Sequence, residues 1–453
     1  MDLSFFDSLA DELSALSGGT AAGAGKQTVL TAEQFDGANA SDVIEKALES
    51  CAHLIVPSLP YPLILDRPIV LSSGKRLSVA PDTVIRIREG CGGCMVRSAH
   101  LLSGITSEIR PDYRDRDILV EGGIWEGGKM EVAVNDPDPV MRSFGHGECG
   151  VFFFDNAERF TVRKVTVKES GIYAFLINAC RDFVIEDVFF DHQHKDGVHV
   201  NGPASDGVIR RMHGNTGDDF VALNAWDWNG SAVSFGYIRR ILVEDLHCEG
   251  DELRLLPGRK CYPDGSKTPC PISDCIFRRV TGAYCIKLYQ QPNCCNDLTG
   301  ENDRSDIAGE IENVLFSDIG LDKLTEEGFG EIGVTALFEV IADCRNICFD
   351  NVRVNVSKDS FRAAGMRLCE VGAKSSTWKH GSSDPATWCE LFDVDLICTA
   401  EGMHFRDIYF VEEKCTDRDT LIGAHRLHPN PDYPNTLPKG GTGYGILGEI
   451  TIE

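Results

Sequence analysis

Apolar and polar residues alternate in the same phase in three successive segments, 173–178, 196–201 and 219–224. Each segment ends in an asparagine, Asn178, Asn201 or Asn224, so the pattern returns every 23 residues. Alternation with a period of two is typical of a β-strand with one buried face. A repeat in the low twenties with one apolar strand per repeat indicates a solenoid, in which stacked repeats share a continuous core.

The asparagine column indicates which solenoid to expect. Side-chain amides stacked about 4.8 Å apart bond to one another and to turn backbone, as at a turn of a parallel β-helix. Asp155 extends this column one coil back. In the last segment Val221 and Leu223 are the expected core residues, which places Phe220 and Ala222 on the other face. We therefore expect an all-β chain, a single-stranded right-handed parallel β-helix.

Strand-like repeats continue nearly to the end of the chain. Further strands are expected around Phe160, Phe183, Val208, Ile241, Cys275, Val314, Ile347 and Ile408. After residue 224 their spacing stretches to about 30 residues, which predicts inserted loops at 225–236, 256–271, 289–310 and 372–388. Loops gathered on one face of a solenoid usually build its binding site.

The expected organisation has three parts. Residues 1–25 read as a short helix and a Gly/Ala/Ser linker, and 26–415 as the β-helix. Within that part, residues 41–51 form an amphipathic helix with Ser41 as N-cap, and this helix caps the solenoid. Residues 416–453 are rich in Pro, Gly and His and are expected to form an irregular tail packed on the solenoid.

Charge and cysteine content narrow the function classes. A net charge of −26 argues against nucleic acid and anionic membranes as partners. The 18 cysteines accompany no visible secretion signal, which predicts reduced thiols in the cytoplasm. Cys91 and Cys94 form a lone CxxC pair without a second pair at zinc spacing, so no metal or other cofactor is predicted. A homo-oligomer is compatible with the sequence.

Two outward columns follow if Val198, Val221, Leu253 and Ile286 are core positions. One column then holds His199, Ala222, Arg254 and Lys287, and the other holds Asp196, Asp219, Asp251 and Tyr284. Stacked coils bring neighbours in a column to about 5 Å, so several carboxylates in one cleft cannot all ionise cheaply. At least one carboxyl pKa should rise, as a general acid requires, and the basic column can bind an anionic or hydroxyl-rich ligand.

Other side chains near these columns are candidate substrate contacts. Trp226 and Trp228 follow the third strand directly and offer either a stacking platform for sugar rings or a cover for the coil. The remaining candidates are Glu252, His146, His192 and His194, and Glu126 is a further carboxylate of unknown role.

The carboxylate motifs resemble those of the polygalacturonases, glycoside hydrolase family 28, over roughly residues 40–290. That family carries Asn-Thr-Asp, Asp-Asp, Gly-His-Gly and Arg-Ile-Lys on successive coils. Here Lys195-Asp196 stands for the first motif and Asp218-Asp219 for the second. Gly250-Asp251-Glu252 stands for the third and lacks its His, and Cys285-Ile286-Lys287 keeps only the Lys of the fourth.

The resemblance implies a pectin-lyase-like β-helix and hydrolysis with inversion. It makes Asp219 the general acid, with Asp196 and Asp218 activating water about 6.5–9.5 Å away. It makes Lys287 a contact to a substrate carboxylate or ring hydroxyl. The implied activity is a glycosidase on α-linked oligosaccharides, exo-acting, with uronic-acid or pectin-derived glycans among its candidate substrates.

Two other function classes remain open. A β-helix lyase or fructotransferase is the first, and a pectate-type lyase needs Ca²⁺ and a basic residue such as Arg254 or Lys287. A catalytically silent carbohydrate-binding β-helix is the second. Such proteins favour long uninterrupted coils over the looped face and stacked carboxylates expected here.

Overall fold

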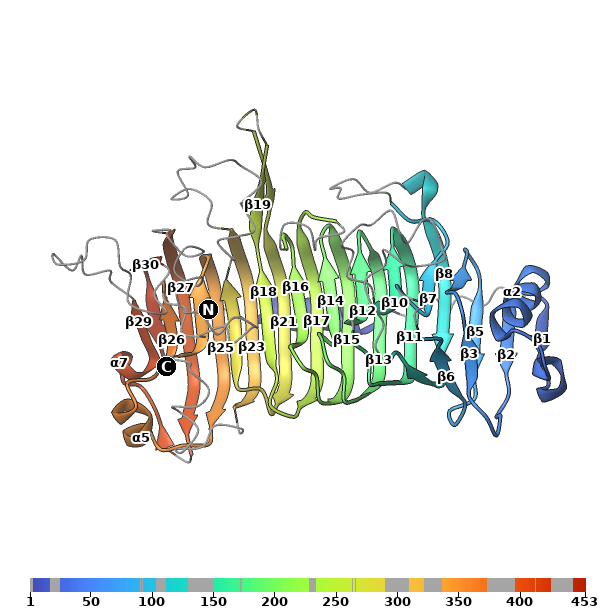
Figure 1. Ribbon diagram of the computed structural model, residues 1–453. Coiled ribbons are helices and arrows are strands. Elements are labelled where there is room, and N and C mark those ends of the chain that lie inside the picture. The colour runs from blue at the N-terminus through green and yellow to red at the C-terminus, as the bar shows by residue number, and fades with distance from the viewer. Residues whose placement is uncertain are drawn as a thin grey trace, which may run out of the picture.

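The computed structural model is one elongated stack of parallel coils, as Figure 1 shows. It describes residues 3–16, 25–89, 91, 93–102, 111–128, 150–171, 173–227, 234–262, 264, 266–289, 309–321, 336–372, 396–411, 413–424 and 443–453. The coils form a right-handed parallel β-helix, which confirms the expected fold. No helix in these ranges is long and apolar enough to cross a membrane.

One side of the solenoid is an eleven-stranded parallel sheet, here called the short-strand sheet. Its strands in spatial order are β4 (Ile69–Leu71), β7 (Val96–Ser98), β10 (Gly150–Asp155), β12 (Tyr173–Asn178), β14 (Val198–Asn201), β16 (Asp219–Asn224), β18 (Glu252–Leu256), β22 (Cys285–Tyr289), β24 (Ala336–Ile341), β26 (Arg367–Val371) and β29 (Ile422–Ala424). Asp155, Asn178, Asn201 and Asn224 are successive register partners, so the predicted column is confirmed.

A second, eighteen-stranded sheet wraps the rest of each coil and is called the long-strand sheet. Its main strands are β1 (Gln27–Val29), β2 (His53–Val56), β5 (Arg76–Val79), β8 (Asp115–Glu121), β11 (Ala157–Lys168), β13 (Arg181–Asp191), β15 (Ala204–Gly214), β17 (Ile238–Cys248), β21 (Ile272–Thr281), β23 (Glu310–Leu321), β25 (Asp343–Val354) and β27 (Leu396–Phe410). Shorter members are β3 (Leu63–Leu65), β6 (Val84–Ile87), β9 (Ile124–Glu126), β28 (Glu413–Lys414), β30 (Gly443–Leu447) and β31 (Ile450–Ile452). β19 (Gly258–Cys261) and β20 (Lys267–Cys270) form a separate antiparallel hairpin.

In the long-strand sheet, each main strand from β11 to β27 bends at a residue with positive φ. Lys164, Asp187 and Arg211 have φ of 54°, 56° and 52° and are skipped in the pairing between their strands. A single residue in the left-handed region turns the strand from one face of the coil to the next. The side chains at this corner pair between coils, as Arg211 does with Asp187 (2.7 Å) and Arg279 with Asp245 (2.6 Å).

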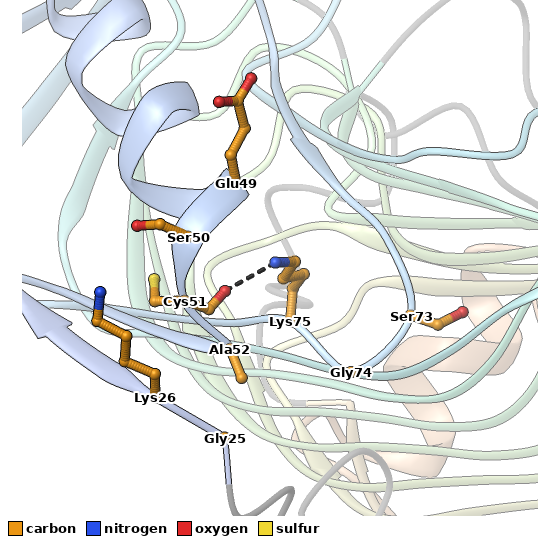
Figure 2. Close-up of a pocket in the computed structure, with 9 residues that line it drawn as sticks. All are labelled: Gly25, Lys26, Glu49, Ser50, Cys51, Ala52, Ser73, Gly74 and Lys75. Carbon is orange, nitrogen blue, oxygen red and sulfur yellow. Dashed lines mark hydrogen bonds between the residues drawn. The ribbon is translucent and has the colours of Figure 1, made fainter.

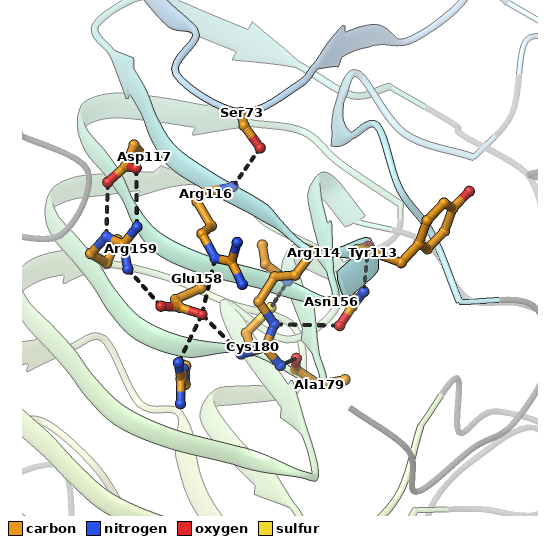
Figure 3. Close-up of polar contacts among 12 residues, drawn as sticks. Ser73, Tyr113, Arg114, Arg116, Asp117, Asn156, Glu158, Arg159, Ala179 and Cys180 are labelled. Carbon is orange, nitrogen blue, oxygen red and sulfur yellow. Dashed lines mark hydrogen bonds and ion pairs between the residues drawn. The ribbon is translucent and has the colours of Figure 1, made fainter. Parts of the chain in front are cut away.

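Glu158 anchors a second corner (Figure 3). Its buried carboxylate accepts from Arg159 at 2.6 Å and pairs with Arg181 at 3.0 Å, and Arg114 and Arg116 both lie 3.4 Å away. Burial would raise the pKa of Glu158, but Arg181, Arg114 and Arg116 lower it overall. These arginines are therefore engaged in linking adjacent coils of the solenoid.

Helices close the first end of the stack and cover one outer face. The cap α2 (Ala40–Ser50) confirms the predicted helix, but its N-cap is Asn39, whose side chain accepts from the N–H of Ser41. The preceding turn is the 3₁₀ helix Ala32–Phe35, and another short one is Pro111–Tyr113. Figure 2 shows a pocket beside α2, where Lys75 Nζ donates to the carbonyl oxygens of Leu48 (2.5 Å) and Cys51 (2.7 Å) and so caps the helix.

The N-terminal helix α1 (Ser4–Ser14) packs on the outside of the long-strand sheet. Phe6, Leu9, Ala10 and Leu13 are its buried residues. They lie on an apolar stripe with one residue per coil, namely Val184, Val208, Leu242, Ile276, Leu315 and Cys348. The expected helix of residues 1–25 therefore exists and covers outward-facing apolar surface, while residues 17–24 lie outside the described ranges.

The C-terminal segment differs from the irregular tail that we expected. α5 (Lys358–Ala363) and α7 (Arg418–Leu421) precede β29, which adds a strand to the short-strand sheet. β30 and β31 both pair with β27 in parallel. The described parts of 416–453 thus add strands to both sheets, while residues 425–442 lie outside the described ranges.

Candidate active site

Three aspartates meet at the entrance of β14 and β16. Their nearest carboxylate oxygens all lie within 4.8 Å of one another, with Asp196 and Asp219 buried and Asp218 half-buried. Gly197 donates its N–H to the carbonyl oxygen of Asp219 at 2.9 Å, and a Cβ there would lie 2.6 Å from the Phe220 oxygen. A Cβ on Gly217 would lie 2.3 Å from the carbonyl oxygen of His194. The two glycines therefore permit the backbone approach that gathers the three acids.

A β-bulge at Phe220 sets the direction in which the side chains of β16 point. The register between β16 and β18 shifts between Asp219 and Val221, so one extra residue sits on β16. Phe220 packs in the core at 5.2 Å from Phe190, edge to face, and does not share the outer face with Ala222 as the alternation predicted. Because two consecutive residues enter the core, Asp219 and Ala222 both face outward.

The same bulge corrects the second predicted column. Asp219 pairs in register with Glu252, and Asp251 is displaced from the position expected for it. The Asp251 carboxylate instead accepts from the N–H groups of Thr216 (3.0 Å) and Glu249 (3.2 Å) and so holds the turn before the site. Burial raises the pKa of Asp251 to about 6.

The first predicted column is confirmed. His199, Ala222, Arg254 and Lys287 are successive register partners on neighbouring strands. The small Ala222 lies between His199 and Arg254, so Arg254 can reach back over it. Its Nη2 forms an ion pair with Asp219 and lies 3.5 Å from Asp196. One guanidinium group thus bridges two carboxylates of the site.

His199 links the site to an acid that the sequence analysis missed. One ring nitrogen of His199 lies 2.6 Å from Asp196 and the other lies 2.7 Å from Asp227. Asn224 donates to the same Asp227 oxygen at 3.0 Å, and Tyr173 stacks on the imidazole at 4.2 Å between ring centres. Burial lowers the pKa of His199, but the two carboxylates outweigh it and raise that pKa to about 10.

The imidazolium acts on its partner in return. Burial favours the neutral form of Asp227, yet the charge and hydrogen bond of His199 depress the pKa of Asp227 far below its ordinary value. Asp227 follows β16 by three residues and has no counterpart in the repeat, so only its position between Trp226 and Trp228 pointed to the site.

Lys287 and Glu252 form the next pair along the cleft. Lys287 Nζ forms an ion pair with Glu252, and the Tyr284 hydroxyl donates to the other Glu252 oxygen. Burial opposes ionisation of Glu252, but Lys287 lowers the pKa of that carboxyl overall. Among the described residues, Glu339 is the next register partner of Lys287, and its side chain is fully buried.

The adjacent carboxyls of Asp218 and Asp219 both have raised pKa values. Burial and the neighbouring Asp196 raise the pKa of Asp218. Burial raises the pKa of Asp219 well above its usual range, against the opposing charge of Arg254. These shifts favour the protonated form of both carboxyls relative to a free aspartate, as a site that supplies a general acid requires.

Several other predicted contacts lie away from this cluster. Trp226 is 1 % exposed, packs on Phe235 at 5.1 Å and lies under Lys260, so it covers the coil and offers no face to a sugar. Glu126 pairs with Arg86 outside the cleft. His192 and His194 are exposed on the turn before β14. Trp228 and His146 lie outside the described residues.

The three clustered aspartates could also hold a metal ion. The oxygens of Asp196, Asp218 and Asp219 are close enough together to hold a cation. Arg254 already brings a positive charge to two of these three acids. The cluster therefore has its own counter-charge, and its chemistry can be derived from protein groups alone.

Comparison with known proteins supports the fold. No family model matches the chain, and no curated protein sequence matches it. A polygalacturonase from Erwinia carotovora aligns with a TM-score of 0.51 and 13% identity, covering 89% of this chain and 95% of its own. An exopolygalacturonase from Thermotoga maritima aligns with a TM-score of 0.51 and 12% identity, covering 91% and 97%. At these identities the chain is similar to both in its β-helix fold.

Proposed function

We propose that this protein is a glycoside hydrolase that cleaves α-linked oligosaccharides with inversion. The observation that carries the proposal is the cluster of Asp196, Asp218 and Asp219 at one entrance of the short-strand sheet, with unequal burial. Glycoside hydrolysis needs one protonated and one ionised carboxyl at the scissile bond. The fold shared with polygalacturonases is compatible with this chemistry.

Asp218 is proposed as the general acid. The sequence resemblance assigned this role to Asp219, but a proton donor must reach the oxygen of the leaving group. Asp218 is the half-buried member of the cluster, whereas Asp219 is fully buried and clamped by Arg254. Burial and the neighbouring Asp196 raise the pKa of Asp218, which favours the protonated form that a general acid needs.

Asp196 and Asp219 are proposed to hold and deprotonate the attacking water. Arg254 bridges them, and the imidazolium of His199 contacts Asp196 from the far side. Because Arg254 and His199 engage these two carboxylates, we assign them to hold the attacking water and not to attack the sugar themselves, which gives inversion. The spacing is shorter than expected, because the oxygens lie within 4.8 Å whereas inverting enzymes usually separate the carboxyls by about 6.5–9.5 Å.

The test is a screen of nitrophenyl α-glycosides and α-linked oligosaccharides, followed by proton NMR of the first-formed anomer. We expect hydrolysis of at least one α-glycoside with inverted product. A retained anomer would overturn the water mechanism, and no hydrolysis would overturn the proposal. Chain-length analysis of the products tests the exo mode, which predicts release of single terminal residues.

A lyase acting through Ca²⁺ is the alternative that the three clustered oxygens support. Such an enzyme needs a basic residue that can take a proton from the substrate. Arg254 and Lys287 are each ion-paired with a buried carboxylate, which disfavours that role. Loss of activity in a chelator, with a product that absorbs as an unsaturated sugar, would favour the lyase over the hydrolase.

A further inference from the structure

The cations that face the cleft are neutralised by acids of the fold itself. Arg254 and Lys287 are 5 % and 4 % exposed, so little of either remains open to a ligand. Arg254 pairs with Asp219, and Lys287 pairs with Glu252. His199, the third cation, lies between Asp196 and Asp227. Each of these three positive charges therefore already has a carboxylate partner.

Acids also continue beyond these pairs. Past Lys287, the same outward column holds Glu339 and then Glu370 on the next two strands. Asp218 stands at the entrance itself. Glu339 is fully buried, so the carboxylates that an anionic ligand would meet are Glu370 beyond Lys287 and Asp218 at the entrance. The net charge of −26 adds a long-range repulsion that slows the approach of any polyanion.

We propose that the cleft selects a neutral α-glycoside and rejects a uronide, because Glu252 occupies the position on Lys287 that a sugar carboxylate would need. This inference rests on the proposed hydrolase function and narrows its substrate class. A uronide would have to displace Glu252 from Lys287, or Asp219 from Arg254, and leave a buried carboxylate without its partner. Breaking such a buried ion pair typically weakens binding by roughly a hundredfold or more.

Glu252 owes this position to the bulge at Phe220, which brings it into register with Asp219. Tyr284 fixes its second oxygen, so the carboxylate is held on both sides. A neutral sugar can then form hydrogen bonds through its hydroxyl groups with the half-buried Asp218 and with the outer atoms of the Arg254–Asp219 and Lys287–Glu252 pairs. The carboxylate of Glu252 is accordingly a specificity-determining group of the cleft.

The first test compares kcat/KM for matched nitrophenyl glycosides, such as the α-galactoside against the α-galacturonide and the α-glucoside against the α-glucuronide. We expect the neutral member of an accepted pair to be preferred by roughly a hundredfold or more. A preferred uronide overturns this inference and leaves the hydrolase standing. Hydrolysis of neither class overturns the proposed function.

The second test separates charge selection from catalysis. We expect oligogalacturonate to leave the melting temperature of the wild-type protein unchanged. In Glu252→Gln, where Lys287 loses its partner, oligogalacturonate should raise the melting temperature and the uronide disadvantage should shrink by about tenfold or more. Stabilisation of the wild type by oligogalacturonate, or an unchanged ratio in the variant, would contradict the role of Glu252.

Two further variants serve as controls. Glu126→Gln breaks a carboxylate–arginine pair outside the cleft and should not change the neutral-to-uronide ratio. Tyr284→Phe removes the hydroxyl that donates to Glu252 but keeps the Lys287 pair, so it should retain the neutral preference. Should Glu252→Gln fail to fold, Tyr284→Phe and the wild-type binding test still decide. A uronide preference in Tyr284→Phe would sink the proposal.

Discussion

Replacing His199 with Gln removes a buried cation that two carboxylates share. The imidazole lies 2.6 Å from Asp196 and 2.7 Å from Asp227, and all three side chains are almost completely buried. Glutamine keeps much of the volume but carries no charge, so both acids lose their counter-ion. Removing one partner of a buried ion pair typically costs about 3–5 kcal/mol, and we expect a loss of that size at pH 7.

The pH dependence shows whether charge is the cause. In the wild type the His199 pKa is raised from 6.5 to about 10. Its stabilising contribution is therefore fully present below pH 6.5 and disappears as the pH rises through about 10. At about 1.36 kcal/mol per pKa unit, this shift corresponds to roughly 5 kcal/mol. This figure and the loss of about 3–5 kcal/mol given above describe the same interaction of His199 with its two carboxylates, so they are not added.

Acid should reduce the stability difference between His199→Gln and the wild type. Without the imidazolium, burial raises the carboxyl pKa of Asp227, so the folded state binds more protons than the unfolded state. The stability deficit of His199→Gln should then be largest at pH 7 and shrink as the pH falls toward about 4, where the carboxyls are neutral.

Thermal unfolding between pH 4 and pH 8 measures this deficit. With about 2.1 cal/mol/K per residue over 453 residues, a loss of 3–5 kcal/mol lowers Tm by roughly 3–5 °C if the solenoid unfolds as one unit. The control is His192→Gln, an exposed histidine that pairs with Asp191 at the surface and should shift Tm little at any pH. Parallel Tm curves for wild type and His199→Gln would refute the reasoning.

Three further predictions concern the acid, the outer helix and the thiols. Asp218→Asn should lower kcat by about 10²–10⁴ with natural leaving groups and much less with activated aryl glycosides, at unchanged Tm; equal losses on both would remove Asp218 as the acid. Leu9→Asp should detach α1 from its apolar stripe, since a buried leucine is worth about 2–5 kcal/mol, and dye binding to exposed apolar surface should rise; no change would mean that α1 does not cover the stripe in solution. The described cysteines are free thiols, so titration of the denatured protein should find that most of the 18 cysteines react. A small number of reactive thiols would contradict a reducing compartment.

The coil repeat was predictable because core positions repeat in sequence and in space with the same period. Val198 and Val221 pair in register as the alternation required, and so do Asn201 and Asn224. The corner ladders were not predictable in the same way. Asp187 and Arg211 look like ordinary polar residues inside strands, and their ion pair is visible only once the register between coils is known.

The packing of the outer helix α1 on the long-strand sheet was missed for a related reason. The apolar residues that α1 covers, such as Val184 and Val208, lie on the outward face of long strands, one per coil. Sequence alternation alone cannot say whether an outward apolar residue is exposed or covered by a distant segment. The helix itself was expected, but its contact with strands far along the chain depends on the tertiary fold.

The site was predicted in its parts but not in its register. Asp196, Asp218, Asp219, Arg254 and Lys287 do converge, because each lies at a fixed offset from a core residue of its own coil. A bulge adds a residue without disturbing the apolar pattern on either side, so no count along the sequence could reveal it.

The bulge at Phe220 also affects which ligands the cleft can bind. Had Phe220 stayed on the outer face, Asp251 would have faced Asp219, and Glu252 would have pointed toward the core, where an unpaired carboxylate is costly. With the bulge, Phe220 fills the core and Glu252 turns outward beside Lys287. The cation that the family resemblance assigned to a substrate carboxylate is then neutralised by the protein. The charge selectivity of this site thus follows from a packing choice in the core, and a change at Phe220 should alter substrate charge preference without touching any residue of the cleft.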